Sequence, residues 1–163
     1  MINDTELIYG AAFIKLINFG EKVTIAYASQ IHSSVYLVQT NKSKSAILFK
    51  KSTKPQSAWS FTLTDRDLSA LDNLHQEYPE FSIFLALLCH KDGICCLTEE
   101  QLWTIIERDA NIQSQNISVS RKGSGSYRVN GPGRKKMAGS IPQNSWPRLV
   151  LLNREKSYEQ NSY

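Results

Sequence analysis

The spacing of apolar residues at the start of the chain predicts a helix. Asn3 precedes the first apolar positions, Glu6 follows three residues later as in a capping box, and Gly20 marks the end of the helix. Three consecutive small residues would let this helix pack closely against a sheet. The positions that we expect on its buried face are Leu7, Gly10, Ala11, Phe13, Ile14 and Ile17.

Short segments rich in Val, Ile, Tyr and Phe predict strands along most of the remaining chain. The first three are joined by short polar linkers, which favours an antiparallel meander. One later segment, 81–89, is almost continuously apolar, as expected of a fully buried central strand. The predicted strands are residues 22–29, 35–40, 46–51, 59–63, 81–89, 94–97, 117–121 and 127–130.

Capping residues predict two more helices. Thr64 or Asp65 begins a helix that ends before Pro79, and Thr98 with Gln101 forms a second capping box. A turn or short helix is expected near residues 142–152. This order predicts an α+β or mixed α/β fold, with one central mixed sheet, an N-terminal helix, a three-strand meander and flanking helices.

Length and composition indicate one globular domain. The 163 residues are 41% hydrophobic and 21% charged, which is ordinary for a folded protein. We expect a single domain over residues 1–154, followed by a frayed polar tail over 155–163. There is no apolar run of the roughly 18 to 20 residues that a membrane span needs, and the N-terminus lacks the pattern of a secretion signal. A cytoplasmic protein is therefore predicted.

Charge is distributed unevenly along the chain. Residues 65–109 contain ten acidic residues and three cations, whereas residues 110–154 contain eight cations and no Asp or Glu. A basic face of this kind attracts polyanions by neutralising phosphates and releasing counterions, so nucleic acid is the expected class of partner. The alternative is that these cations pair with the acidic middle segment in the fold.

The order of the first elements resembles the PD-(D/E)XK restriction-endonuclease-like superfamily, which includes the archaeal Holliday-junction resolvases. The likeness rests on the segments 6–13, 33–38 and 46–52. In such enzymes the second strand brings an Asp, and the third brings a Glu, Asp or Gln two positions before a Lys. The resemblance therefore implies a nuclease-like core over roughly the first 90 residues.

The metal-binding carboxylates of that superfamily are missing here. Ser33 or Ser34 stands where the Asp is expected, while Phe49 precedes Lys51 by two positions and Leu48 precedes Lys50. Mg²⁺ at a scissile phosphate needs acidic oxygen ligands, which these residues do not supply. The resemblance leaves Lys50 or Lys51 as a phosphate contact and Glu6 as a helix carboxylate, so it implies a pseudo-nuclease.

Other residues suggest chemistry of lower specificity. Cys89, Cys95 and Cys96 invite a zinc interpretation, but adjacent strand residues face opposite sides, so buried thiols are expected instead. His32, close to the strand lysines, is a candidate general base for metal-free RNA cleavage. Tyr127 or Trp146 could stack on an exposed base beside the cations of the C-terminal third.

Three hypotheses follow. The leading one is a nucleic-acid-binding domain, for DNA or RNA, with nuclease-like architecture and no cofactor or metal. The second is a protein-interaction module, of inhibitor or immunity type, that uses the acidic segment 65–109. The third is a divergent nuclease, which would need Mg²⁺, or a metal-free ribonuclease, with Glu6, His32 and Lys51 as catalytic candidates. The predicted contacts to nucleic acid are Lys50, Lys51, Arg121, Lys122, Arg128, Arg134, Lys135 and Lys136.

Overall fold

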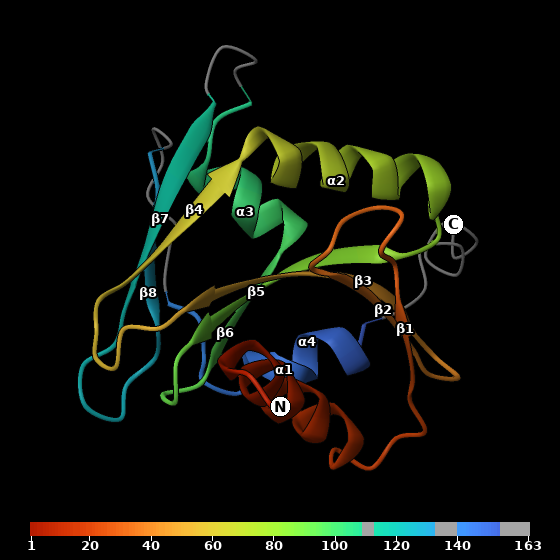
Figure 1. Ribbon diagram of the computed structural model, residues 1–163, viewed down its shortest axis with the longest axis horizontal. Helices are drawn as coiled ribbons and strands as arrows, with labels where there is room; N and C mark the ends of the chain where they lie inside the picture. The colour runs from red at the N-terminus through yellow and green to blue at the C-terminus, as the bar shows by residue number, and fades with distance from the viewer. Residues whose placement is uncertain (109–112, 133–139, 154–163) are drawn as a thin grey trace.

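The computed structural model describes residues 1–108, 113–132 and 140–153, and it has the α+β architecture expected from the sequence (Figure 1). An N-terminal helix precedes a three-strand meander, as predicted. The elements in chain order are α1 (Asp4–Ile17), β1 (Thr24–Tyr27), β2 (Val35–Gln39), β3 (Lys44–Ser52), β4 (Trp59–Thr64), α2 (Asp65–Glu77), β5 (Ser82–Cys89), β6 (Ile94–Thr98), α3 (Glu99–Ile105), β7 (Ser114–Ser120), β8 (Arg128–Asn130) and α4 (Ser145–Leu151).

The central sheet is mixed and has the strand order β1-β2-β3-β5-β6. β1, β2 and β3 form the predicted antiparallel meander, and β5 lies parallel to β3. A parallel neighbour requires a crossover connection, which β4 and α2 supply. β6 then pairs antiparallel with β5 through the tight turn at residues 90–93.

The remaining strands form a second sheet with the order β4-β7-β8, rather than extending the central one. β4 and β7 are antiparallel, with Trp59 opposite Val119 and Leu63 opposite Gln115. The alternating pattern of β4 buries Trp59, Phe61 and Leu63 on one side and exposes Ser60 and Thr62 on the other. That single apolar face packs into the same core as α2 and α3.

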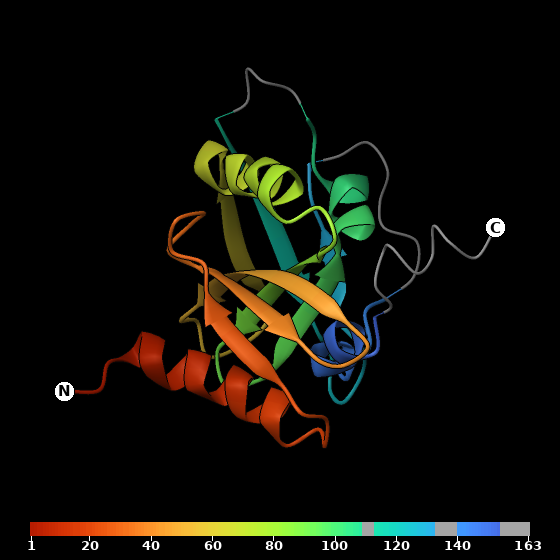
Figure 2. The ribbon, with the colours of Figure 1, turned by 90° about the vertical axis from the view of Figure 1, so that its right-hand side faces the viewer.

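Two apolar cores lie on opposite faces of the central sheet. Figure 2 shows α2 and α3 on one side and α1 and α4 on the other. β3 contributes Leu48 to the core on the α2 side and Ile47 and Phe49 to the core on the α1 side. β5 divides its residues in the same way, which explains why its sequence is apolar at nearly every position.

The predicted helix starts are confirmed. Asn3, Thr64 and Thr98 are N-caps, and both threonines belong to reciprocal capping boxes. α1 ends at Ile17, three residues before the expected Gly20, and α2 ends ahead of Pro79 as expected.

The buried face of α1 differs from the prediction. Ala12 and Leu16 are fully buried, whereas Leu7, Ile14 and Ile17 are 57% to 60% exposed. The helix carries apolar residues around most of its circumference, so periodicity alone does not select the face that meets the sheet. Contacts with the aromatic residues of β2 and β3 select it instead.

Part of the predicted basic loop and the C-terminal tail lie outside the described residues, which omit 133–139 and 154–163. Within the described part of the chain, no helix has both the length and the apolar character that crossing a membrane requires.

Candidate nucleic-acid interface

The positions singled out by the nuclease resemblance meet at the junction of α1, β2 and β3. The backbone N–H of Phe49 donates to the carbonyl oxygen of Ser34 over 3.0 Å. The hydroxyl of Tyr9 donates to Ser34 Oγ over 3.4 Å, and the Lys51 ammonium donates to the hydroxyl of Thr5. Two strands and the first turns of α1 therefore bring Ser34, Phe49 and Lys51 together.

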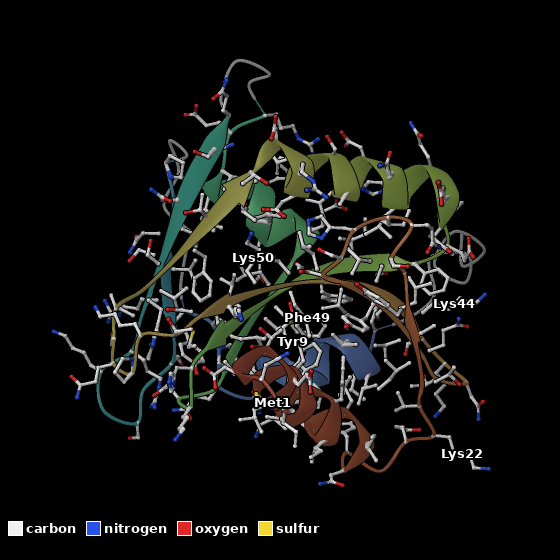
Figure 3. All side chains as sticks on the ribbon, viewed as in Figure 1. Met1, Tyr9, Lys22, Lys44, Phe49 and Lys50 are labelled. Carbon is white, nitrogen blue, oxygen red and sulfur yellow. The ribbon has the colours of Figure 1, made fainter. Side chains whose placement is uncertain are left out.

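The side chains at this junction do not fit a Mg²⁺ site. Phe49 is buried, with its ring centroid 5.1 Å from that of Tyr9, and both lie between α1 and the sheet (Figure 3). Ser34 offers one hydroxyl, while the carboxylate of Glu6 accepts a hydrogen bond from Asn3 at the helix N-terminus. Mg²⁺ prefers carboxylate oxygens in octahedral geometry, which a phenyl ring excludes. In the described ranges, no three His, Cys, Asp or Glu residues gather to hold a metal.

A hollow of about 510 Å³ lies beside this junction, between α1 and the strands β1 and β2. Tyr27 and Tyr36 are opposite each other in the strand register, and their rings stack with centroids 4.9 Å apart and planes 26° apart. Tyr27 is 53% exposed, so one side of this stack is open to a ligand. We call this hollow the tyrosine pocket; its lining residues are Thr5, Glu6, Tyr9, Gly10, Phe13, Tyr27, Ser33, Ser34 and Tyr36.

Two tyrosine hydroxyls of this pocket, those of Tyr9 and Tyr36, have a raised pKa. Burial raises the pKa of Tyr9, although its hydrogen bond to Ser34 lowers the pKa in part. Burial also raises the pKa of Tyr36, and nearby Tyr27 adds to that increase. Tyr9 and Tyr36 therefore present aromatic rings without phenolate charges that would repel a phosphate.

The loops 53–58, 90–93 and 121–127 lie together at one end of the molecule (Figure 1), and exposed cations lie in these loops or next to them in the sequence. The backbone N–H of Arg121 donates to Ser57 Oγ over 3.1 Å, which joins two of these loops. Arg128 begins β8 directly opposite Ser120, so it belongs to the same end. We call this surface the basic edge, and its exposed cations are Lys51, Lys54, Lys91, Lys122 and Arg128.

Arg121 is part of the framework under the basic edge. Its Nε lies 2.9 Å from Asp92 Oδ2 and its Nη2 lies 2.5 Å from Asp92 Oδ1. Tyr127 also donates to Asp92, over 2.9 Å. Hydrogen bonds from Arg121 lower the pKa of Asp92 despite its partial burial, so this carboxylate stays ionised and neutralises the guanidinium. The alternative interpretation of the charge pattern, pairing with the acidic segment, thus holds for this residue.

Lys50 points away from Lys51, to the α2 side of β3, and forms a cluster with Asp67 and His32. Asp67 is 2% exposed and accepts hydrogen bonds from Lys50 Nζ over 2.8 Å and from the Thr64 N–H over 2.9 Å. Burial alone raises the pKa of Asp67, but Lys50 and the Thr64 N–H lower it by more. The carboxylate is therefore ionised, and Lys50 is committed to it.

His32 belongs to the same cluster and does not have the geometry of a general base. Its Nδ1 accepts the Ser34 N–H over 2.9 Å, so the ring proton is assigned to Nε2. That nitrogen lies 2.9 Å from Asp67 Oδ1. Both ring nitrogens are thus held by the protein, and the catalytic role considered for His32 lacks a free nitrogen to receive a substrate proton.

The other residues considered from the sequence are placed as follows. Tyr127 and Trp146 are 1% and 3% exposed, so the prediction that they stack on a base is wrong: their rings fill the two cores.

Cys95 and Cys96 face different cores, and burial raises the pKa of Cys89 to about 12, so the thiols stay protonated. The predicted contacts outside the described residues are Arg134, Lys135 and Lys136.

The sequence analysis missed the tyrosine pocket and two cations of the basic edge, Lys54 and Lys91. Tyr27 and Tyr36 lie near the facing ends of β1 and β2, so the predicted meander contained the signal that pairs them. The position of Tyr9 against them depends on how α1 docks, which is not a local property of its sequence.

Comparison of the chain with protein-family models, with curated proteins and with solved structures finds no match. The proposal below therefore rests on the geometry of the described residues.

Proposed function

We propose that this protein is a nucleic-acid-binding domain that holds its ligand without metal-dependent cleavage. The observation that carries the proposal is the basic edge, where five exposed cations from four separate segments gather at one end of the molecule. Phosphates neutralised at such a surface release condensed counterions, which supplies affinity without sequence preference. Arg121 and Asp92 neutralise each other's charge, so they add no net charge beneath the exposed cations.

The tyrosine pocket favours an unpaired base as part of the ligand. Lys51 reaches Thr5 on the rim of this pocket, so a phosphate bound at Lys51 would place the next nucleotide near Tyr27. Aromatic stacking contributes about 1 to 3 kcal/mol per base and tolerates any base. We therefore infer a preference for single-stranded over duplex nucleic acid.

Two features argue for binding rather than cleavage. Ser34 and Phe49 occupy positions at which a metal-dependent nuclease needs acidic ligands, and His32 is held at both ring nitrogens. The acidic-surface alternative is weakened because Asp67 is buried, Asp92 forms an ion pair with Arg121, and Glu99 shares a hydrogen bond with His75.

The direct test is a titration of labelled single-stranded DNA, single-stranded RNA and duplex DNA across a salt series. In the double variant Lys51→Glu/Lys122→Glu, we expect the affinity to fall by at least about tenfold and the slope of log affinity against log salt to flatten by about 2. The matched control is Lys22→Glu/Lys42→Glu, which changes the net charge equally at exposed positions. Lys22 lies at the opposite end of the molecule, and so does Lys44, which is two residues after Lys42 in the sequence (Figure 3).

Denaturing gels of the same mixtures with added Mg²⁺ measure cleavage. Intact nucleic acid with salt-dependent binding supports the proposal, whereas cut products that disappear in Lys51→Ala would identify a nuclease. Equal loss of affinity in both double variants would show that net charge, rather than the basic edge, controls binding.

A further inference from the structure

The exposed apolar side chains of this protein are concentrated on and beside α1. In Figure 2 this helix lies at the outside of the molecule, with one side against the sheet and the other side uncovered by any described element. Monomeric proteins rarely leave large apolar patches uncovered, so this concentration of exposed apolar side chains on and beside one helix indicates a docking surface. Eight large apolar residues of the described chain are exposed, six of them before residue 20: Met1, Ile2, Leu7, Ile14, Ile17, Phe19, Tyr27 and Leu152.

Gly10 lies between Leu7 and Ile14 along α1, where this surface borders the tyrosine pocket, and the fold of the single chain does not require a glycine there. A Cβ built at Gly10 meets no atom within 4 Å. Glycine inside a helix is less favourable than alanine, because it loses more backbone entropy on folding. Together with Ala11, it leaves a flat region between Leu7 and Ile14 where a second helix backbone can approach closely.

The charged residues Asp4 and Lys15 beside this face are placed so that they would complement a second copy of α1 that runs antiparallel to the first. Asp4 and Lys15 both line a groove of about 710 Å³ between α1 and the β5–β6 turn, so they lie on the same flank of the helix. Asp4 lies six residues before Gly10 and Lys15 five residues after it. A two-fold axis near Gly10 would therefore bring Asp4 of one copy to Lys15 of the other, twice.

The same axis pairs the apolar residues. Leu7 lies three residues before Gly10 and Ile14 four residues after it, so each Leu7 meets Ile14 of the other copy. An interface in which one patch meets itself is what a two-fold dimer requires. We propose that α1 is a homodimer interface, in which two copies pack their α1 helices antiparallel across Gly10.

This proposal is tested by sedimentation of the full chain from micromolar to near-millimolar concentration. We expect a concentration-dependent change from monomer to dimer. Leu7→Glu and Ile14→Glu should each raise the dissociation constant by about tenfold or more, because they place a charge in the centre of the contact. Leu152→Glu, at a residue that is 53% exposed at the end of α4, is the matched control and should leave the equilibrium unchanged.

A charge exchange separates the antiparallel arrangement from other associations. Asp4→Lys and Lys15→Asp should each weaken the dimer, and the double variant should restore it, because the exchanged charges again face opposite signs. Circular dichroism of the monomers checks that each variant is folded. A wild-type protein that stays monomeric throughout the concentration range would overturn the proposal. So would a dimer that Leu7→Glu and Ile14→Glu leave intact, since another surface would then form it.

Discussion

Lys50 and Lys51 are neighbours in the sequence but have different environments, because adjacent residues of a strand point to opposite faces. Lys50 is bound to the buried carboxylate of Asp67 on the α2 side, whereas Lys51 is exposed on the α1 side. The sequence left both as possible phosphate contacts. The direction of their side chains leaves Lys51 as the one available at the basic edge.

Asp67 is the charged residue whose substitution should affect stability most clearly. Asp67→Asn keeps the shape of the side chain but removes the charge that Lys50 and His32 face. Breaking a buried ion pair leaves its partner poorly compensated, so we expect the free energy of unfolding at pH 7 to fall by about 2 kcal/mol. Urea denaturation measures this, with Asp72→Asn on the exposed side of α2 as the control.

The sign of the pH effect follows from the lowered pKa of Asp67 in the folded state. The folded protein binds this proton less readily than the unfolded chain, so the contribution is complete above the ordinary Asp pKa of about 4. It is lost as the pH falls from there through the lowered pKa. The stability difference between wild type and Asp67→Asn should therefore narrow in acid; a constant difference from pH 7 to pH 3 would contradict this assignment.

Tyr27 is the residue that should distinguish single-stranded from duplex ligands. Tyr27→Ala removes the exposed ring of the tyrosine pocket but no cation of the basic edge. Because one stacked base contributes about 1 to 3 kcal/mol, affinity for single-stranded DNA should fall about 5- to 150-fold while duplex affinity stays nearly constant. Tyr27→Phe retains the ring and is the control. Equal losses for both ligands in fluorescence anisotropy would place the base elsewhere.

At the scale of elements, the sequence predicted what local interactions determine. A cap such as Thr98 with Gln101 lies within a few residues of the helix that it starts, so its pattern carried the whole signal. The continuous apolar run of β5 likewise indicated a strand covered on both faces. These local patterns explain why the order of helices and strands was predicted correctly.

Elements whose position depends on distant contacts were not predicted. The pattern of β4 indicates a half-buried strand but not that its neighbour is β7, about 55 residues later. The pattern of α1 indicates a helix but not that Ala12 and Leu16, rather than Leu7 and Ile14, meet the sheet. The candidate site combines both limits, because Tyr9, Tyr27 and Lys51 come from three elements and meet only after α1 has docked.

For the whole molecule, the charge segregation along the sequence is partly cancelled by the fold. Arg121, from the basic third, pairs with Asp92 from the acidic segment, and Lys50 pairs with Asp67. Charge counts along a chain do not indicate which pairs form, because that depends on how loops meet at the ends of the two sheets. The set of exposed cations left at the basic edge is therefore smaller than the charge count of the sequence implied, and it lies at one end of the molecule.

The two cores should unfold together, because β3 and β5 contribute side chains to both. Trp146 lies in the core on the α1 side, whereas Trp59 and Trp103 report on the α2 side. In a urea titration, the fluorescence of Trp146→Phe therefore reports on the α2 side, through Trp59 and Trp103. The fluorescence of Trp59→Phe/Trp103→Phe reports on the α1 side, through Trp146. Within each variant, we expect fluorescence and far-UV circular dichroism to have the same midpoint, as a single two-state transition requires.

Truncations in each core test this coupling. Leu16→Ala on the α1 side and Leu74→Ala on the α2 side each remove a fully buried side chain, so each should lower the free energy of unfolding by about 3 kcal/mol. If the central sheet couples the cores, Leu16→Ala shifts the fluorescence of Trp59 and Trp103 as much as that of Trp146. A shift confined to Trp146 would mean that α1 and α4 detach from the sheet before the rest of the molecule unfolds.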